Sequence, residues 1–314
     1  MLSSDSKIVL PGGAGLVGQN LVVRLKEKGY RNLVVLDKHQ ENMVIMKNLH
    51  PDILIEYADL ANEGEWRKHF ESASCCVMLQ AQIGAKEAAP FVRNNLDSTM
   101  RIIEVIKKYS VPFTVHISSS VVESVADDDY TRTKREQERI VLESGITCVI
   151  LRPTLMFGWF DRKHLGWLSR FMKRVPVFPI PGDGRYMRQP LYVGDFSRII
   201  ISCIERSGPL GIYNISGFEK IDYIDIIRQI RSTIGSKTII LKLPVSLFSL
   251  LLKIWAFFDS DPPFTADQLK ALVAKDEFEL IDWEKIFGVR ATPFAEAVKE
   301  TFTHQIYSGV VLRF

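Results

Sequence analysis

The sequence lacks an excess of charge of either sign. Its 314 residues include 40 Lys or Arg and 37 Asp or Glu, which gives a formal net charge of +3 at pH 7. Proteins that bind nucleic acid mainly through its phosphates carry a clear basic excess, so this balance argues against nucleic acid as a partner. With 46% apolar and 25% charged residues, the composition also excludes a disordered or collagen-like chain.

Cysteine is scarce as well. Cys75 and Cys76 adjoin in one apolar run, while Cys148 and Cys203 stand alone in others. No pair has the spacing of zinc ligands, and four cysteines in a chain of this length do not make a disulfide framework. We therefore expect buried, reduced thiols and no metal site. Residues 1–7 are polar and lead directly into a strand pattern, so we expect no signal peptide and a cytoplasmic protein.

No apolar run is long enough to suggest a transmembrane helix. The longest, Leu243–Phe258, has sixteen residues and includes Lys253, whereas a membrane span needs about 20. On a helix its polar residues would form one stripe. The members of this stripe are Lys242, Ser246, Ser249 and Lys253. The run predicts a helix packed in the core or in a subunit interface. The alternative is an interfacial helix that lies on a membrane or lines a channel for an apolar substrate.

Short β-rich runs alternate with helical patterns in the first half of the chain. Strands are expected at Ile8–Leu10, Leu33–Leu36, Ile53–Glu56, Cys75–Leu79, Thr114–Ile117 and Thr147–Leu151. Helices are expected at Leu16–Lys28, Glu41–Leu49, Glu65–Glu71, Asn95–Tyr109 and Asp129–Glu143. Such alternation is typical of parallel βαβ units, so the sequence predicts an α/β fold with a doubly wound parallel sheet.

The second half of the chain is less regular. Pro153 marks a turn, and helical patterns return at Asp195–Glu205, Tyr223–Thr233 and Pro293–Thr303. There is no internal repeat and no low-complexity linker. We expect residues 1–152 to form a dinucleotide-binding domain and residues 153–314 to form mainly a smaller α/β substrate-binding part, with some segments returning to the first sheet.

A glycine-rich loop joins the first expected strand to the first helix. Gly13, Gly15 and Gly18 fit G-x-G-x-x-G, and with Gly12 in first place the loop also fits G-x-x-G-x-x-G. Glycines permit a tight turn and close approach of a pyrophosphate, which the N–H groups of the following helix then bind. Asp37 ends the second strand, nineteen residues beyond Gly18. Its carboxylate is placed to bind ribose hydroxyls and to repel a 2′-phosphate, which favours NAD over NADP.

Tyr130 and Lys134 stand four residues apart and would share one face of a helix. An ammonium group near a phenol favours the phenolate and would lower the pKa of the tyrosine. Tyr130 would then accept a proton from a substrate hydroxyl while hydride leaves for the nicotinamide. Ser120, at a strand end, would hydrogen-bond the same substrate oxygen. The preceding acidic residues, 127–129, are expected to cap the helix.

These motifs and others resemble those of the extended short-chain dehydrogenases/reductases, of the nucleotide-sugar epimerase/dehydratase kind. The matching segments are Gly12–Gly18, Asp59-Leu60, Asn95–Thr99, Ile117–Ser120, Tyr130–Lys134, Leu151–Pro153, Phe157-Gly158, Gly182–Gly184, Arg188, Val193–Asp195, Tyr213–Ile215 and Thr292–Phe294. The resemblance covers nearly the whole chain. It implies a Rossmann sheet and a homodimer formed through the helices Asn95–Tyr109 and Asp129–Glu143.

The resemblance also implies roles for individual residues. NAD would be bound by Gly12, Gly13, Gly15, Leu16, Val17, Gly18, Asp37, Asp59, Leu60 and Lys134. The catalytic residues would be Ser120, Tyr130 and Lys134, with Ser118 and Ser119 as alternatives for the serine. Arg188 would bind the diphosphate of a substrate, because Arg contacts phosphate in a bidentate way.

One departure from the family pattern reduces the number of reactions that we expect the protein to catalyse. Sugar-nucleotide 4,6-dehydratases carry an Asp-Glu pair after the catalytic Thr, whereas this chain has Val121-Val122, which argues against dehydration. We expect an NAD-dependent epimerase or oxidoreductase that acts on a secondary hydroxyl of a small molecule, with a nucleotide-activated sugar favoured. The alternatives are an enzyme like 3β-hydroxysteroid dehydrogenase that acts on a lipid alcohol, and a non-catalytic NAD(P)-binding accessory subunit related to respiratory complex I.

Overall fold

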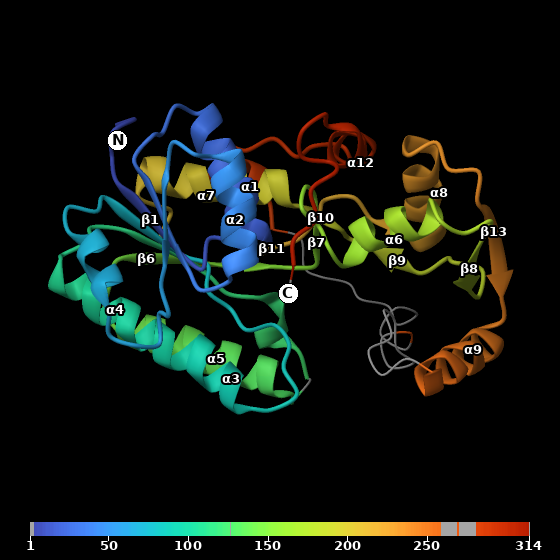
Figure 1. Ribbon diagram of the computed structural model, residues 1–314, viewed down its shortest axis with the longest axis horizontal. Coiled ribbons are helices and arrows are strands. Elements are labelled where there is room, and N and C mark those ends of the chain that lie inside the picture. Colours follow the sequence, from blue (N-terminus) through green and yellow to red (C-terminus); the bar gives the residue numbers. More distant parts are fainter. Residues whose placement is uncertain (1–2, 126, 259–268, 270–280, 314) are drawn as a thin grey trace.

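A parallel seven-stranded sheet forms the centre of the protein (Figure 1). The computed structural model describes residues 3–125, 127–258, 269 and 281–313. The strands lie in the order β11-β6-β5-β4-β1-β2-β3. Their bounds are β1 Ile8–Pro11, β2 Leu33–Asp37, β3 Leu54–Tyr57, β4 Cys75–Met78, β5 Thr114–Ile117, β6 Cys148–Pro153 and β11 Gly211–Ile215. The order reverses at β1, so the expected doubly wound sheet is confirmed.

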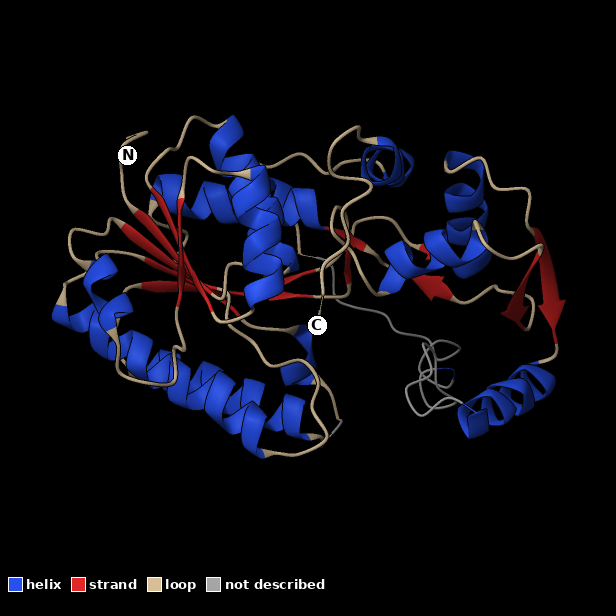
Figure 2. Ribbon diagram, in the orientation of Figure 1, coloured by secondary structure: helices blue, strands red, loops and turns tan. Residues whose placement is uncertain are grey.

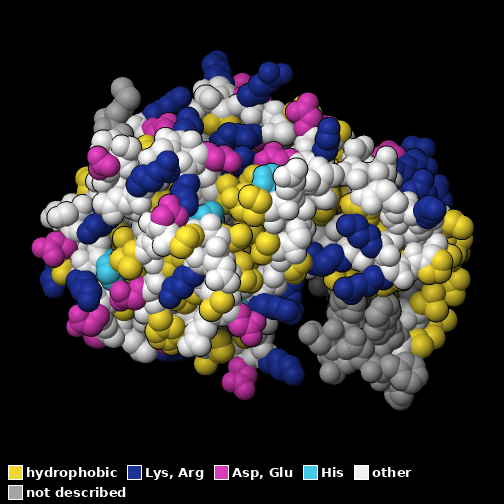
Figure 3. All heavy atoms as spheres, turned by 45° about the horizontal axis from the view of Figure 1, so that its top comes forward, with side chains coloured by type: hydrophobic (Ala, Val, Ile, Leu, Met, Phe, Trp, Pro, Cys, Tyr) yellow, Lys and Arg dark blue, Asp and Glu magenta, His cyan; other side chains and the backbone are white. Residues whose placement is uncertain are grey.

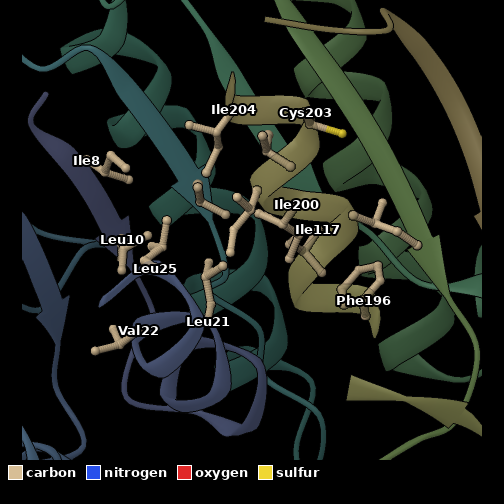
Figure 4. Packing of buried hydrophobic residues seen from close by; sticks show 14 of the residues in the cluster. Ile8, Leu10, Leu21, Val22, Leu25, Ile117, Phe196, Ile200, Cys203 and Ile204 are labelled. Atoms are coloured by element: carbon tan, nitrogen blue, oxygen red, sulfur yellow. The ribbon is translucent and has the colours of Figure 1, made fainter. Parts of the chain in front are cut away.

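Helices cover both faces of this sheet (Figure 2). On one face lie α1 (Leu16–Glu27), α2 (Gln40–Leu49) and α7 (Val193–Arg206); on the other lie α4 (Ser98–Lys108) and α5 (Asp129–Glu143). Both faces of the inner strands β1, β4 and β5 are buried, and β1 and β4 are accordingly continuously apolar. Figure 4 shows one of the two resulting cores, in which side chains of β1, such as Leu10, meet Leu21 of α1 and Ile200 of α7.

Two segments from the second half of the chain belong to this layer. Strand β11 pairs in parallel with β6, from Gly211 opposite Val149 to Ile215 opposite Pro153. Helix α7 packs against α1, and its apolar side chains join the same core. The nucleotide-binding lobe therefore extends beyond residue 152, through segments that return to the first sheet.

A smaller second lobe is built from short strands and helices. Its strand pairs are β7 (Met156–Phe157) with β10 (Leu191–Tyr192), β8 (Val177–Pro181) with β13 (Ile239–Leu243), and β9 (Met187–Arg188) with β12 (Ile221–Asp222). Its helices are α6 (His164–Met172), α8 (Tyr223–Thr233), α9 (Val245–Phe258) and α12 (Phe294–Thr303). Its own core includes Phe157, Ile227 and Phe294. The remaining elements are α3 (Ala89–Phe91), α11 (Trp283–Phe287), the 3-10 turns η1 (Glu65–Phe70) and η3 (Ser120–Glu123), and the π-helix η2 (Val92–Asp97).

Helices α5 and α8 have the bounds that the sequence predicts, while two other expected helices are present with a different helix type over part or all of their length. The helix expected at Asn95–Tyr109 begins as the π-helix η2, and the segment expected as a helix at Glu65–Glu71 is the 3-10 turn η1. Lys242 lies in β13 rather than on α9, so the expected polar stripe is divided between two elements.

The apolar helix is not in the core. Of the α9 side chains that the structure describes, Leu252 is buried, while Leu247, Leu250, Leu251 and Ile254 are exposed. Within the described residues, no helix combines the length and apolar character needed to cross a membrane.

The four cysteines are free thiols, three buried and Cys148 partly buried, as predicted. Burial raises the pKa of each of them, so they stay protonated at neutral pH.

Candidate functional site

The glycine loop between β1 and α1 is shaped by two glycines that the protein itself requires. Gly12 has a φ of +77°, and a Cβ atom on it would collide with the backbone of Gln80. A Cβ atom on Gly18 would collide with the backbone of Gly13. These two glycines let the loop turn tightly against the sheet and against itself.

Gly15 differs, because no protein atom requires a glycine there. The nearest atom to a Cβ at this position would be the carbonyl oxygen of Gly12, at 3.8 Å. Gly15 is the N-cap of α1, where no side chain caps the helix and no acidic residue occupies the first turn. Free N–H groups, the positive end of the helix dipole and open space meet at this point, which suits a pyrophosphate. The loop therefore fits NAD.

Two carboxylates lie at the ends of β2 and β3: Asp37 is the last residue of β2, and Asp59 comes two residues after β3. In the sheet, β2 lies between β3 and β1, the strand that leads into the glycine loop. Asp37 accepts hydrogen bonds from the N–H groups of Ala14 and His39, both at 2.9 Å, and so braces the loop. Asp59 accepts from the Arg93 guanidinium at 3.1 and 2.5 Å. Partial burial opposes ionisation of Asp59, but the hydrogen bond from Arg93 and the charge of Lys38 outweigh it, and its pKa lies below the usual value. The Asp59 carboxylate is therefore ionised at neutral pH.

The end of β5 and the start of α5 bring together the predicted serine and tyrosine motifs. Asp128 caps α5 by accepting from the N–H of Thr131 at 2.8 Å, as expected for the acidic run. The side chain of Tyr130, in the first turn, interacts with that of Ser119, and this interaction lowers the pKa of the tyrosine. Ser120 instead begins the turn η3. The structure thus brings Ser119, one of the two alternatives, to Tyr130.

The pKa of Tyr130 is not lowered as the sequence suggested. Burial raises it, the hydrogen bond with Ser119 offsets part of this, and the charge of Asp128 raises it further. Lys134 does not counteract this shift. Its side chain is buried, which lowers its own pKa to about 7, and its ammonium group is directed elsewhere.

The Lys134 Nζ donates to the carbonyl of Ile117 at 3.1 Å and to the Gln137 side chain at 2.5 Å. Gln137 in turn donates to the Thr99 hydroxyl at 2.8 Å. Asn95 is fully buried and donates to Thr133, the residue before Lys134, at 3.0 Å. Sequence reasoning missed Gln137, although its position one helical turn after Lys134 on the same face is the signal that could have found it.

A buried ion pair supports the serine run from the same side of α5. Glu138 lies on the face of α5 that carries Tyr130 and Lys134, and only 5% of its surface is exposed. It accepts from the Ser118 hydroxyl at 2.7 Å and from the Nε and Nη2 of Arg152. Arg152 also pairs with Glu123 at 2.6 Å. This network fixes the end of β5 against α5 and β6.

Arg188 lies in the second lobe, on β9. Its guanidinium donates to the carbonyl of Met187 at 3.0 Å and lies 5.9 Å from the centre of the Tyr186 ring. Tyr186 stacks on Tyr223, with ring centres 5.4 Å apart. The arginine is therefore half-buried among aromatic rings.

A sheet in this order, a glycine loop before α1 and a Ser-Tyr-Lys group beyond β5 define a dinucleotide-binding protein of the short-chain dehydrogenase/reductase type. The chain belongs to the NAD dependent epimerase/dehydratase family, whose model matches residues 8–216. NAD is the cofactor of that family.

Similar proteins have several functions. The ceramide reductase of Caulobacter vibrioides is 22% identical over 96% of this chain and 92% of its own length. The 40 kDa subunit of the Neurospora crassa NADH-ubiquinone oxidoreductase is 24% identical over 48% of this chain and 40% of that subunit. Among solved structures, the UDP-glucose 4-epimerase of Thermotoga maritima, crystallised with UDP-glucose, superposes with a TM-score of 0.74 at 20% identity and covers 94% of this chain and 97% of that one. At that identity the last likeness shows the fold.

Proposed function

We propose that the protein is an NAD-dependent oxidoreductase or epimerase that acts on a secondary hydroxyl group, with Tyr130 as the proton acceptor. The observation that carries this proposal is the interaction between the Tyr130 and Ser119 side chains beyond the end of β5. NAD, when bound, supplies the hydride acceptor. In the direction of reduction, the Tyr130 hydroxyl would donate its proton to the substrate oxygen as hydride arrives there; in the direction of oxidation, the resulting phenolate would take the proton back from the substrate hydroxyl.

Lys134 and Ser119 complete the proposed catalytic group, in which Ser119 replaces Ser120. Burial and the contacts to Ile117 and Gln137 hold the Lys134 ammonium in one place. With a pKa near 7, this amine gains a proton readily when an oxygen acceptor approaches, and a ribose hydroxyl is the partner that the family resemblance implies.

The proposed NAD site follows the order of the elements. The pyrophosphate would lie on the loop and helix start formed by Gly12, Gly13, Gly15, Leu16, Val17 and Gly18. The adenosine would lie beside Asp37, Asp59 and Leu60, at the ends of β2 and β3. The open space at Gly15 is the main structural support for this placement.

For the substrate we propose first a nucleotide-activated sugar. Arg188 would bind its diphosphate, and the adjoining Tyr186 and Tyr223 offer ring surfaces for a base or a sugar. The likeness of the whole fold to a UDP-glucose 4-epimerase supports this choice. Val121-Val122, beside the serine run, supplies no acid or base for loss of water, so epimerisation or simple redox chemistry is favoured over dehydration.

A lipid alcohol or ketone is the second candidate, and two observations favour it. The ceramide reductase resembles this chain over nearly its whole length. Helix α9 in the second lobe exposes an apolar face that a sugar nucleotide does not need. A lipid substrate would come from a membrane, and we propose that residues 243–258 contact it. A homodimer through α4 and α5 also stays a proposal, supported by the exposed Met100 and Leu142 on those helices.

Mass spectrometry of ligands that co-purify with the protein tests the substrate class. A bound sugar nucleotide supports the first candidate, and a bound ceramide-like or sterol-like lipid supports the second and overturns the first. The ligand found is then supplied with NAD, and nicotinamide reduction or epimer formation is followed.

Tyr130→Phe separates an enzyme from an accessory subunit. The variant should bind NAD as the parent does, while kcat falls by about 10²–10⁴-fold because the proton acceptor is gone. A parent protein that binds NAD yet turns over neither substrate class would instead support an accessory subunit, as the Neurospora crassa relative suggests.

A further inference from the structure

Helix α9 presents an apolar face to solvent. Leu247, Leu250, Leu251 and Ile254 are 42%, 53%, 46% and 48% exposed, and they follow one another at i, i+3, i+4 and i+7. This spacing places the four side chains on one side of the helix. Leu252, on the other side, is 8% exposed and packs inward. The helix is therefore fixed to the lobe by one apolar side, while a second apolar side stays exposed among the residues that the structure describes.

The neighbouring strand pair extends this surface. Ile239 and Leu241 of β13 are exposed, and alternate residues of a strand point to the same side. Val177 of β8 is directly paired with Ile239 and is also exposed. Figure 1 places β8, β13 and α9 together at the end of the molecule away from the central sheet, and Figure 3 shows hydrophobic side chains gathered along that end. We call these seven residues of β8, β13 and α9 the apolar face.

Basic residues gather around the apolar face. Residues 162–188 contain seven Lys or Arg and one Asp, and residues 228–253 contain five Lys or Arg and no acidic residue, although the whole chain carries only +3. The exposed cations closest in sequence to the apolar face are Lys173, Arg174, Lys237, Lys242 and Lys253. Among the described residues, none of these five forms an ion pair. Figure 3 shows Lys and Arg side chains beside the hydrophobic end.

We propose that the apolar face docks onto a membrane surface that contains anionic lipids. Its leucines and isoleucines would enter the boundary of the acyl chains, while the surrounding lysines and arginines reach the phosphates of the headgroups. A second copy of the chain fits this surface less well, because pairing two apolar faces would bring two unpaired basic clusters together. This docking goes beyond the proposed reaction, since it requires no turnover.

Co-sedimentation with vesicles tests the proposal on the full chain. The parent should bind vesicles of phosphatidylcholine mixed with phosphatidylglycerol, bind pure phosphatidylcholine at least about tenfold more weakly, and be released by about 1 M salt, which shortens the Debye length to about 3 Å. Leu250→Glu combined with Ile254→Glu should abolish binding to both. Lys173→Glu combined with Lys242→Glu should lower affinity for the mixed vesicles by about tenfold or more and leave binding to pure phosphatidylcholine unchanged.

Val44→Glu is the matched control, because Val44 is 56% exposed on α2 in the other lobe. It should bind vesicles as the parent does, and NAD binding reports that every variant is folded. Equal binding of the parent to both lipid compositions, or no binding, overturns the proposal. The proposal is also overturned if the parent is a dimer, the Leu250→Glu variant is a monomer, and neither of the two proteins binds vesicles. Tyr130→Phe should dock normally, so failure of the proposed reaction and failure of docking can be told apart.

Discussion

Three adjacent serines after β5 have three different surroundings. Ser118 donates to the buried carboxylate of Glu138, Ser119 bonds Tyr130, and Ser120 starts the turn η3. The chain leaves its strand at this point, so each successive side chain points in a new direction. The motif placed the proposed catalytic serine only to within this triplet, and the path of the backbone then decided which serine side chain meets that of Tyr130.

Alanine substitutions at two of these serines should therefore differ. Ser119→Ala removes the hydroxyl that bonds Tyr130, and we expect kcat to fall by about 10²-fold or more with NAD affinity unchanged. Ser120→Ala should keep kcat within about threefold of the parent. Steady-state kinetics with the identified substrate checks both. A larger loss at Ser120 than at Ser119 would contradict the assignment.

Burial of Lys134 predicts a pH-dependent stability. The pKa of Lys134 is about 7 in the folded protein, where the side chain is buried, and 10.5 when the side chain is not buried, as in the unfolded chain. Between these two pH values the unfolded chain therefore holds a proton that the folded chain lacks. Stability rises with pH wherever the unfolded state binds more protons. Relative to Lys134→Met, the parent should gain about 1.4 kcal/mol of unfolding free energy per pH unit between about pH 7.5 and 9.5.

Urea unfolding of the two proteins without NAD, at several pH values, measures this difference. Lys237→Met is a matched control: because Lys237 is exposed, this substitution removes one charge without removing a buried amine. Its stability relative to the parent should not vary with pH over this range. If the unfolding free energies of the parent and of Lys134→Met change with pH in the same way, the Lys134 amine keeps its ordinary pKa in the folded state.

At the scale of elements, the glycine loop combines glycines that serve the fold with one that leaves room for a ligand. Gly12 has a positive φ, and a Cβ atom on it would collide with the backbone of Gln80 just after β4, whereas Gly15 has open space beside it. The sequence motif treats these positions alike. Their different roles arise because β4 lies directly beside β1 in the sheet, on the side of Gly12.

Alanine at these two glycines should separate stability from cofactor binding. Gly12→Ala forces a side chain against the Gln80 backbone at a positive φ, and we expect a drop in Tm of several degrees or loss of soluble protein. Gly15→Ala should keep Tm within about 2 °C in the absence of NAD and weaken NAD binding by about tenfold or more. Differential scanning fluorimetry and NAD titration measure the two effects. Unchanged NAD affinity in Gly15→Ala would place the pyrophosphate elsewhere.

At the scale of the whole molecule, the chain crosses between its two lobes more than once. It leaves the central sheet after β6, builds strands of the second lobe, and returns as α7 and β11. Phe196, Ile199 and Ile200 of α7 are fully buried in the core shared with β1 and α1. The first lobe is therefore complete only when these later segments are present.

A fragment of residues 1–152 should not fold cooperatively. Without α7 and β11 it exposes the part of one sheet face that α7 covers and the outer edge of β6, and it loses several large apolar contacts at once. We expect a broad, non-sigmoidal urea transition by circular dichroism and strong binding of a hydrophobic dye, with the full chain as the control. A sigmoidal transition in the fragment would show that residues 1–152 are an independent domain.

The sequence by itself determined the layered fold, the glycine loop and the family, because these depend on local periodicity and on spacings within one βαβ unit. It located Tyr130 and Lys134 on one helix for the same reason. The tertiary structure decided which serine meets Tyr130, how burial shifts the pKa of Lys134, and that α7 and β11 complete the first lobe. It also decided that α9 exposes an apolar face instead of burying it. Each of these depends on contacts between residues far apart in the chain, which no local pattern records.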